Sequence, residues 1–341
     1  MKIKSLEDFF HTYLCCPICM GKLINLRCSS CHQKYPYRNG ILDFRLPHDE
    51  TDNEEARLAT EMLDRFEGTN FSQLMHLRFQ HTSAPPEFIE LYKDYQSTLF
   101  TRGKHMISMF HNRIRTSYKV PDNFLALDVG CGVGASSAIL AKQYQWVIAI
   151  DPSLVDLVLA KKHFAEQNIE NVILIRATAQ KLPICTDSIS LAVALNVIEH
   201  LFTIHDAFAE INRVLKTEGI FCGDSRNRFD LFFPEPHAQL HWVGFWPRRL
   251  QPWYVKKFRS ISYTSAYLLS WFELRKHART AFGKTYKIMM PLVSAYGKSS
   301  KFDNLVKASE KIPILRNLAI LFFPSHLLIA QKTNGEPATN K

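Results

Sequence analysis

Long apolar runs are missing from this sequence. The longest candidate, residues 312–330, is interrupted by Arg316, Asn317 and the Pro-Ser-His group at 324–326. It therefore falls short of the roughly 18 to 20 apolar residues that a membrane-spanning helix needs. The N-terminus also lacks the pattern of a signal peptide, because Glu7 and Asp8 follow its lysines and no small-residue cleavage site follows an apolar core. We therefore predict a cytoplasmic protein without a transmembrane helix.

The composition excludes two further classes of protein. The chain has 341 residues, of which 46% are hydrophobic and 22% charged, so it is neither a disordered tail nor a disulfide-stabilised miniprotein. The length is typical of about two domains. Its eight cysteines are not expected to form a disulfide framework, because the chain shows no export signal.

Acidic residues are nearly absent from residues 236–302. This segment holds twelve Lys or Arg residues and a single acidic one, Glu273, whereas the rest of the chain is close to neutral and the total charge is +10. A one-sided field of this kind favours an anionic partner, which would be a nucleic acid, an acidic or phosphorylated small substrate, or an anionic membrane surface. The alternative is that these lysines and arginines only keep the surface soluble.

Four of the cysteines are regularly spaced. Cys16 and Cys19 form one CxxC pair, and Cys28 and Cys31 form a second after eight residues. Four thiolates at about 2.3 Å satisfy tetrahedral zinc completely, which makes such a site structural. The short link favours a compact zinc ribbon, followed by a strand, a turn at 39–40 and a second strand. A redox pair is the alternative, Cys15 is the spare thiol, and His32 is an alternative ligand to Cys31.

The N-terminal segment also resembles a known family. The sequences CPICMGKL at 16–23 and YPYRNGI at 35–41 are similar to the zinc ribbon of the activator subunit of transfer-RNA methyltransferases. A polar, acidic linker is expected at 47–55, and apolar spacings of three and four residues predict helices over 56–118, with a break at 85–86. These helices are expected to bridge the ribbon to a second domain and to cover part of its face.

The central part of the chain alternates strands and helices. A buried strand at 124–128 leads into three glycines, Gly130, Gly132 and Gly134, and then into a helix at 135–142. Glycines permit the tight turn and let the backbone approach a ligand closely. The alternation predicts a doubly wound parallel α/β sheet that binds its ligand at the carboxyl ends of the strands. The further elements are a strand at 146–150, a helix at 153–166, strands at 172–176 and 191–195, a helix at 204–215, a turn at 217–219 and a strand at 220–224.

Two kinds of cofactor compete for this glycine loop. Gly130, Gly132 and Ala135 satisfy the G-x-G-x-x-[GA] pattern, so an NAD(P)-dependent oxidoreductase is a remote alternative. Asp128, however, lies directly before the loop, where a carboxylate would repel a pyrophosphate but pair with the ammonium of an amino-acid-bearing cofactor. The third glycine at 134 and two later blocks, ATAQKLP at 177–183 and ALNVIEHL at 194–201, also argue against the dinucleotide.

Together these blocks resemble the class I S-adenosylmethionine-dependent methyltransferases, most closely the subgroup with a D-x-G-C-G-x-G loop and an N-V-x-E-H-L block. The resemblance covers residues 125–224. It implies a Rossmann-like α/β sheet of seven strands with the last antiparallel, here preceded by the small zinc ribbon and the helical bridge. The implied domains are residues 1–47, 48–118 and 119–335, the last with an aromatic and basic lid inserted at about 226–302.

The resemblance also assigns the cofactor site. Asp128 would hold the methionine ammonium, Asp151 the ribose hydroxyls, and Asn196 would line the methionine side. Thr178 and Ala179 would lie at the adenine edge, although this subgroup commonly has Asp in place of Thr178. The full implied set for S-adenosyl-L-methionine is Asp128, Gly130, Cys131, Gly132, Gly134, Asp151, Pro152, Thr178, Ala179 and Asn196, and zinc is the second, structural cofactor.

The acceptor side is expected after the fifth strand. Residues 232–249 are dense in aromatics and contain Glu235, His237 and His241. Aromatic walls with an imidazole suit a pocket for an organic acceptor, with His237 or His241 as general base. The alternative is an aromatic lid that packs on itself. A helix at 265–279, a strand at 286–289, a helix at 303–322 and a strand at 326–331 are expected to complete the sheet.

Two classes of acceptor stay open. The favoured acceptor is an oxygen or nitrogen of a small molecule, which is a metabolite or a lipid-like or sugar-linked compound. If the basic segment at 236–302 binds the acceptor, the acceptor is anionic. The alternative is a ribosomal RNA base, because zinc ribbons precede the methyltransferase domain in some guanine methyltransferases. Against RNA, the ribbon between residues 16 and 41 holds only four basic residues, Lys22, Arg27, Lys34 and Arg38, and the Asn/Asp-Pro-Pro-aromatic block of amino-methylating nucleic-acid enzymes is absent. Peripheral contact with a membrane is compatible with either acceptor.

Overall fold

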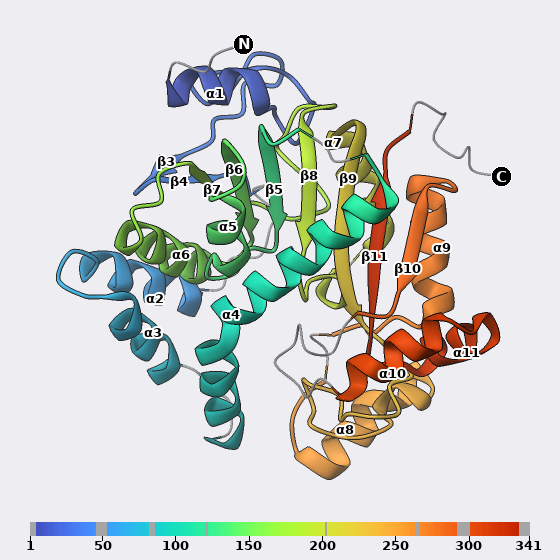
Figure 1. Cartoon of the computed structure of the whole chain (residues 1–341). Helices are drawn as coiled ribbons and strands as arrows, with labels where there is room; N and C mark the ends of the chain where they lie inside the picture. The colour runs from blue at the N-terminus through green and yellow to red at the C-terminus, as the bar shows by residue number, and fades with distance from the viewer. Residues whose placement is uncertain are drawn as a thin grey trace.

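A mixed nine-stranded sheet forms the centre of the protein (Figure 1). The structure, a computed structural model, describes residues 5–45, 53–81, 86–119, 122–201, 203–263, 266–291 and 301–333. The strand order is β10-β11-β9-β8-β5-β6-β7-β4-β3. Seven of these strands come from the predicted methyltransferase region at 119–335: β5 (Leu125–Val129), β6 (Trp146–Asp151), β7 (Val172–Arg176), β8 (Ile189–Ala194), β9 (Leu215–Arg226), β10 (Tyr286–Met289) and β11 (Ser325–Gln331).

The directions of these strands confirm the predicted doubly wound sheet. Strands β5 to β9 pair in parallel, while β11 runs antiparallel between β9 and β10. Every residue of β5 and β8 is buried. Such continuous burial is expected of parallel strands that are covered on both faces, and it explains why the sequence shows them as unbroken apolar runs.

Helices cover both faces of the sheet. On one face α4 (Pro86–Ser117), α5 (Ala135–Leu140) and α6 (Leu154–Glu166) pack over the central strands. On the other face lie α7 (Ile204–Val214) and α9 (Trp271–Phe282). Figure 1 shows α4 crossing the sheet diagonally. The core therefore consists of two apolar layers, and the glycine loop between β5 and α5 lies at the carboxyl edge of the strands.

The N-terminal segment joins this sheet. It contains α1 (Leu6–Tyr13), the hairpin β1 (Leu23–Ile24) and β2 (Arg27–Cys28), and then β3 (Tyr37–Arg38) and β4 (Ile41–Asp43). Strand β4 pairs in parallel with β7, so the ribbon segment adds two strands to the main sheet. The prediction of seven strands therefore holds for residues 119–335 alone, and the domain boundaries at 47 and 118 stay predictions.

The ribbon segment also covers a sheet face that a helix would normally cover. Parallel strands need a crossover connection, usually a helix, yet residues 177–188 between β7 and β8 contain none. Instead Leu14 forms a β-bridge with Ile184, and the Cys185 N–H donates to the Tyr13 carbonyl at 2.9 Å. Phe9 of α1 is fully buried in the same apolar cluster as the sheet. The N-terminal segment thus takes the place of a crossover helix.

The predicted helical bridge consists of α2 (Asn53–Asp64), α3 (Phe71–Gln80) and α4. Helices α2 and α3 pack on α6, and α4 packs on α5. Gly103 of α4 faces Ala135, the first residue of α5, where a Cβ would be in ordinary van der Waals contact at 3.5 Å from the carbonyl oxygen. The bridge therefore covers part of a face of the second domain, as expected, and it also reaches the glycine loop. Most of the predicted linker at 47–55 and the residues 82–85 lie outside the described residues.

The C-terminal third departs from the predicted elements. The predicted helix at 265–279 begins only at Trp271, because Ser270 caps it and forms a capping box with Glu273. The predicted helix at 303–322 is two helices, α10 (Lys301–Glu310) and α11 (Pro313–Phe322). Pro313 stands in the first turn of α11, where its missing N–H costs no hydrogen bond.

Two smaller differences concern the strand β9 and the lid. β9 begins at Leu215, so the turn predicted at 217–219 lies within this strand. The lid contains α8 (Gln251–Arg259), which was not predicted. In the part of the chain that the structure describes, no helix combines the length and the apolar character that crossing a bilayer would require.

Candidate active site and metal centre

The glycine loop has a conformation that only glycine adopts easily. Gly130, Gly132 and Gly134 have φ angles of 68°, 51° and 84°, all in the left-handed region. A Cβ at Gly130 would lie 2.5 Å from Val197 Cγ2, and one at Gly134 would lie 2.6 Å from the Phe164 ring. At Gly132 a Cβ would meet nothing within 4 Å. The outer glycines are therefore required by packing, whereas the middle one faces open space.

Asp128 is fully buried at the end of β5. Its Oδ2 accepts hydrogen bonds from Ser136 Oγ at 2.5 Å and Ser137 Oγ at 2.6 Å. Its Oδ1 is buried and has no hydrogen-bond partner among the described residues. Burial raises the pKa of Asp128 to about 6, although the two serine hydroxyls lower it. An unpartnered carboxylate oxygen at this place can accept a hydrogen bond from a bound ammonium group.

Asp151, at the end of β6, ties the loop to the neighbouring strand. Its Oδ2 accepts from the Gly132 N–H and its Oδ1 from the Ser153 N–H, both at 2.9 Å. Burial raises the pKa of Asp151 to about 7, and the negative charge of Asp156 acts in the same direction. Each oxygen of a carboxylate has a second lone pair, so Asp151 can still accept from a pair of hydroxyls.

A hollow lies between the loop, the end of β8 and the bridge helices. It brings together four of the predicted cofactor residues, Gly130, Cys131, Gly132 and Asn196. The Asn196 N–H donates to Asp224 Oδ1 at 2.8 Å, and this bond fixes the turn after β8. The other predicted cofactor residues are not among those that line the hollow: Asp128, Gly134, Asp151, Pro152, Thr178 and Ala179.

The residues of this hollow that come from the bridge helices were missed by the sequence analysis, because it assigned these helices only a covering role. Arg78 of α3 forms an ion pair with Asp156, and Gln96 and Arg102 come from α4. Gln96 Oε1 is buried without a partner in the described part of the chain. The sequence signal that could have revealed them is the presence of polar residues within the helical pattern that precedes β5.

The expected adenine side is organised around Arg176. This side chain is only 3% exposed, and its Nε donates to the Pro152 carbonyl at 2.9 Å. It also forms an ion pair with Glu55 of α2 at 3.4 Å. Thr178 and Ala179 follow directly, in a turn that the Lys181 N–H closes on the Thr178 carbonyl at 3.3 Å. The bridge therefore contributes to this side of the site as well.

A second group of titratable residues combines Glu199 and His200, which follow β8, with Glu235 and His237 of the lid after β9. His237 Nδ1 and Glu235 Oε1 lie 2.5 Å apart, and the rings of His237 and His200 are 5.0 Å apart. Burial lowers the pKa of His237, but the hydrogen bond and the charge of Glu235 raise it by more, so the net shift is upward. Glu199 is buried with its Oε2 unpartnered among the described residues, and burial raises its pKa.

The two predicted catalytic histidines lie in different surroundings. His237 is largely buried beside Glu235 and the residues after β8. His241 is exposed, and its backbone carbonyl accepts from the Tyr254 hydroxyl at 3.3 Å. Its ring contacts Trp242, and no contact within the described ranges joins it to His237. The structure therefore places only His237 in a cluster that can exchange protons.

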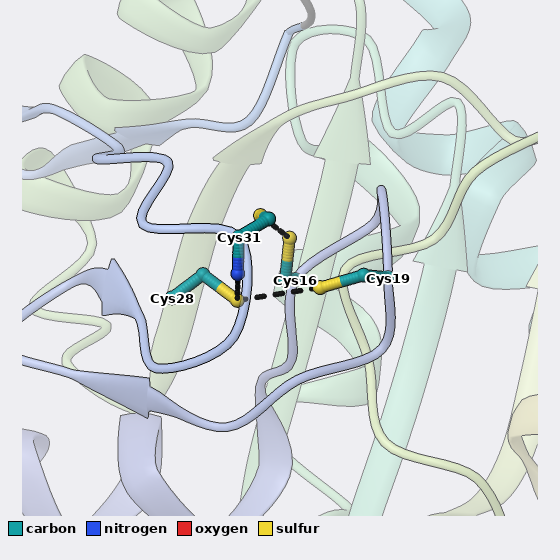
Figure 2. A group of neighbouring side chains, drawn as sticks. All are labelled: Cys16, Cys19, Cys28 and Cys31. Atoms are coloured by element: carbon teal, nitrogen blue, oxygen red, sulfur yellow. Dashed lines mark hydrogen bonds between the residues drawn. The ribbon is translucent and has the colours of Figure 1, made fainter.

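The four predicted metal ligands lie together, as Figure 2 shows. The Sγ atoms of Cys16, Cys19, Cys28 and Cys31 all lie within 4.8 Å of one another. Cys16 Sγ is 3.5 Å from Cys31 Sγ, and Cys19 Sγ is 3.4 Å from Cys28 Sγ. A tetrahedron with metal–sulfur bonds of about 2.3 Å has sulfur–sulfur edges of about 3.8 Å. The cluster thus has nearly the size that zinc requires.

The backbone around the cysteines has turns that place N–H groups close to a sulfur atom. Met20 and His32, each directly after the second cysteine of a pair, have φ angles of 60° and 61°. The N–H groups of Ser30 and Cys31 point at Cys28 Sγ, at 3.4 and 3.5 Å. A Cβ at Gly21 would lie 2.8 Å from the same sulfur. Neither His32 nor Cys15 belongs to the group of four.

Comparison with known proteins identifies the central part of the chain. Residues 127–223 match the family model described as a methyltransferase domain. The uncharacterized methyltransferase YcgJ of Bacillus subtilis is 25% identical over 169 residues, which are 49% of this chain and 62% of that protein. The ubiquinone biosynthesis O-methyltransferase of Azorhizobium caulinodans is 27% identical over 131 residues, which are 37% of this chain and 50% of that protein.

A solved structure was also found. The crystal structure of the YcgJ protein has a TM-score of 0.43 at 17% identity and covers 67% of this chain and 99% of that one. The alignments with the two curated relatives span less than two thirds of the relatives' own lengths. Residues 127–223 thus match a methyltransferase domain, the predicted Rossmann-like α/β fold is supported in this part of the chain, and the predicted enzyme class, an S-adenosylmethionine-dependent methyltransferase, is confirmed.

Proposed function

We propose that the protein is an S-adenosylmethionine-dependent methyltransferase that transfers a methyl group to an oxygen or nitrogen of a small-molecule acceptor. The observation that carries this proposal is the position of Asp128 directly before the glycine loop. Asp128 has one buried oxygen without a partner in the described part of the chain, and Gly132 has open space where a side chain would stand. This combination suits an amino-acid-bearing nucleoside.

The residues present fit S-adenosylmethionine, which supplies an activated methyl group on a sulfonium when it is bound. Asp128 Oδ1 would accept a hydrogen bond from the ammonium of the methionine part. Asp151 keeps its lone pairs for the two ribose hydroxyls while it holds the loop through Gly132. Asn196 lines the same hollow and is fixed by Asp224. The bridge helices then exclude water from the methionine side.

His237 is the proposed general base. When Nδ1 faces the carboxylate of Glu235, this nitrogen keeps its proton, and Nε2 is the nitrogen that can take a proton from the acceptor. Glu235 thus orients the imidazole and stabilises the imidazolium that forms. The raised pKa of His237 favours proton uptake from an oxygen or nitrogen nucleophile. His241 is exposed and is not part of this proposal.

We also propose that the four cysteines bind structural zinc. Four thiolates fill the coordination sphere of zinc and leave no position for a substrate. Tyr35, which is buried, has its hydroxyl 3.0 Å from Cys16 Sγ and can donate to that thiolate. Since Cys16, Cys28 and Tyr35 belong to the same apolar cluster as the sheet, the metal would hold the N-terminal segment on the sheet face.

The burial of the candidate base supports the choice of a small-molecule acceptor. The candidate base is largely buried, a position that suits an acceptor enclosed by the lid. One curated relative is, by its name, an O-methyltransferase of ubiquinone biosynthesis, which agrees with a small organic acceptor. We therefore prefer this class to the RNA base that the sequence left open.

Isothermal titration of the whole protein with S-adenosylhomocysteine tests the cofactor. We expect binding for the wild type, none for Asp128→Asn, and unchanged binding for Asp122→Asn, a control aspartate that precedes β5. NADH serves as the competing ligand. Binding of NADH in place of S-adenosylhomocysteine would overturn the proposal. Methyl transfer from labelled S-adenosylmethionine to total RNA, but not to small-molecule extracts, would move the acceptor to the RNA class.

A further inference from the structure

Helix α11 exposes its apolar face to solvent. Ile314, Leu318 and Phe322 follow one another at intervals of four residues, so they lie on one side of the helix. They are 75%, 57% and 37% exposed, and Leu315 beside them is 49% exposed. The one buried residue of the helix is Ile320, which packs in a small cluster with Val306 of α10. Most of the apolar side chains of this helix therefore face solvent, whereas in an ordinary surface helix they would face the core.

This stripe continues onto the lid. A hollow at the end of α11 is lined almost entirely by aromatic and aliphatic side chains, among them Phe245, Phe272 and Phe322. Phe245 and Phe272 are themselves exposed. Trp246 follows Phe245, and its ring lies 6.2 Å from that of Trp253 on α8. We call the resulting surface the aromatic face; it consists of Phe245, Trp246, Trp253, Phe258, Phe272, Ile314, Leu315, Leu318 and Phe322.

Basic side chains surround the aromatic face. On α8 the exposed residues Lys256, Lys257 and Arg259 stand beside Trp253 and Phe258, and Lys257 Nζ lies 5.1 Å from the Trp253 ring. Lys307, Lys311 and Arg316 are exposed near α11. The only acidic residue between 236 and 302, Glu273, is already paired with Arg248 at 2.6 Å. Residues 301–322 add four basic residues and two acidic ones, Asp303 and Glu310, so the net charge of the segments that form the face is positive.

We propose that the aromatic face docks the protein onto an anionic lipid bilayer. Exposed Trp and Phe residues suit the level of the lipid headgroups, and a short amphipathic helix can lie in the interface plane with its apolar side toward the acyl chains. The surrounding lysines and arginines are attracted to anionic headgroups. Helix α11 has ten residues and is about 15 Å long, so it is suited to lie in the interface.

Charge and side-chain chemistry argue against two other occupants. A second copy bound through the same face would bring two strongly basic segments together, which like-charge repulsion opposes. Single-stranded RNA stacks on aromatic rings and pairs with basic side chains, but it gains little from Ile314, Leu315 and Leu318, which are aliphatic. A lipid surface satisfies the aliphatic, aromatic and basic groups together.

The position of the face relates it to the candidate active site. Figure 1 shows α8, α10 and α11 at the end of the molecule opposite α1. The candidate base His237 and the residues of the aromatic face between 245 and 272 belong to the same lid segment after β9. A protein docked in this way would receive an acceptor that is dissolved in the membrane, a narrower class than the small molecules proposed above. Membrane docking itself does not depend on methyl transfer.

Vesicle flotation of the full-length protein tests the proposal. We expect flotation with vesicles of phosphatidylcholine mixed with phosphatidylglycerol, weaker flotation at high salt, and little with phosphatidylcholine alone. The pair Ile314→Ser and Leu318→Ser should lower partitioning by about tenfold or more, because it removes two apolar side chains from the interface. The matched control is Ile24→Ser, an isoleucine that is 58% exposed on the ribbon, and it should leave partitioning unchanged.

A charge-reversal pair tests the electrostatic part. Lys256→Glu with Lys257→Glu should lower partitioning by about tenfold or more, whereas Lys142→Glu, an exposed lysine after α5, should not. Equal flotation of the apolar variant and the wild type would overturn the proposal. So would a dimer, seen by light scattering, that the Leu318→Ser change dissociates, or binding to RNA without binding to vesicles. S-adenosylhomocysteine titration of each variant separates these failures from a failure of the proposed enzymatic function.

Discussion

The glycine loop allows a test that separates packing from ligand binding. Gly130→Ala and Gly132→Ala are the same chemical change two residues apart, and both put a side chain on a residue with a left-handed φ. They differ in surroundings, because a Cβ at Gly130 would meet Val197 Cγ2 at 2.5 Å and Cγ1 at 2.9 Å, while one at Gly132 would meet nothing. The first change should therefore mainly reduce stability, and the second should mainly reduce cofactor binding.

The expected magnitudes follow from these contacts. A non-glycine residue in the left-handed region costs roughly 1–2 kcal/mol, and this applies to both variants. Forcing a methyl group into a packed site costs roughly 1–3 kcal/mol more, which applies to Gly130→Ala alone. The free energy of unfolding should thus fall by about 2–5 kcal/mol for Gly130→Ala and by about 1–2 kcal/mol for Gly132→Ala.

Urea unfolding and titration with S-adenosylhomocysteine measure the two effects. Gly132→Ala should lower the affinity by about tenfold or more, equivalent to about 1.4 kcal/mol. A double-mutant cycle of Gly130→Ala with Val197→Ala should show a favourable coupling of roughly 1–3 kcal/mol, because the smaller side chain relieves the contact. Equal stability losses for the two glycine variants would refute the packing argument, and unchanged affinity of Gly132→Ala would refute the place of the cofactor.

Three further predictions follow. Because burial raises the pKa of Asp128 to about 6 from about 3.9 when unfolded, the folded state binds more protons between these values. Its contribution to stability should therefore fall as pH rises from about 4 to about 6, by roughly 3 kcal/mol. Urea unfolding of Asp128→Asn should show a smaller pH slope than that of the wild type, and the slope that stays comes from Asp151, whose pKa is also raised by burial. The affinity of the wild type for S-adenosylhomocysteine should rise with pH over the same window. Elemental analysis should find one zinc ion per chain, lost in Cys16→Ser together with a lower melting temperature and retained in the neighbouring control Cys15→Ser; a wild type without metal would end the ribbon interpretation. In methyl-transfer assays His237→Gln should lower kcat by about 10²- to 10⁴-fold without changing S-adenosylhomocysteine affinity, and His241→Gln should have little effect; equal activities of the two variants would remove His237 as the base.

The sequence was sufficient for features that depend on neighbouring residues. Strands β5 and β8 were predicted because both are buried throughout and read as unbroken apolar runs. The glycine loop was recognised because its left-handed turns need three glycines within five residues. The four cysteines were expected to lie together because each CxxC pair is a local turn and the two pairs lie close together in the chain, and their Sγ atoms all lie within 4.8 Å of one another.

Features that depend on distant contacts could not be predicted in this way. A short strand after the turn at 39–40 was predicted and is β4. Its pairing with β7 was not predicted, because Leu174 lies far along the chain from its partner Ile41. Gln96 became a residue of the candidate site only because α4 crosses over the glycine loop. Helix α8 was missed because Gln251 and Val255 are its only buried residues, and two such residues give no apolar stripe.

The pairing of β4 with β7 determines which fragments of the protein can be produced without exposing an edge of the sheet. An edge strand presents a row of unpaired N–H and C=O groups on which other chains can add, so natural sheets shield such edges. Here the shield comes from the first part of the chain, where β4 covers β7 and the Phe44 N–H donates to the Arg176 carbonyl at 2.8 Å. A fragment that begins after the cysteine segment would leave β7 as a bare edge and would be prone to aggregate. The methyltransferase domain should therefore be produced with its N-terminal segment attached.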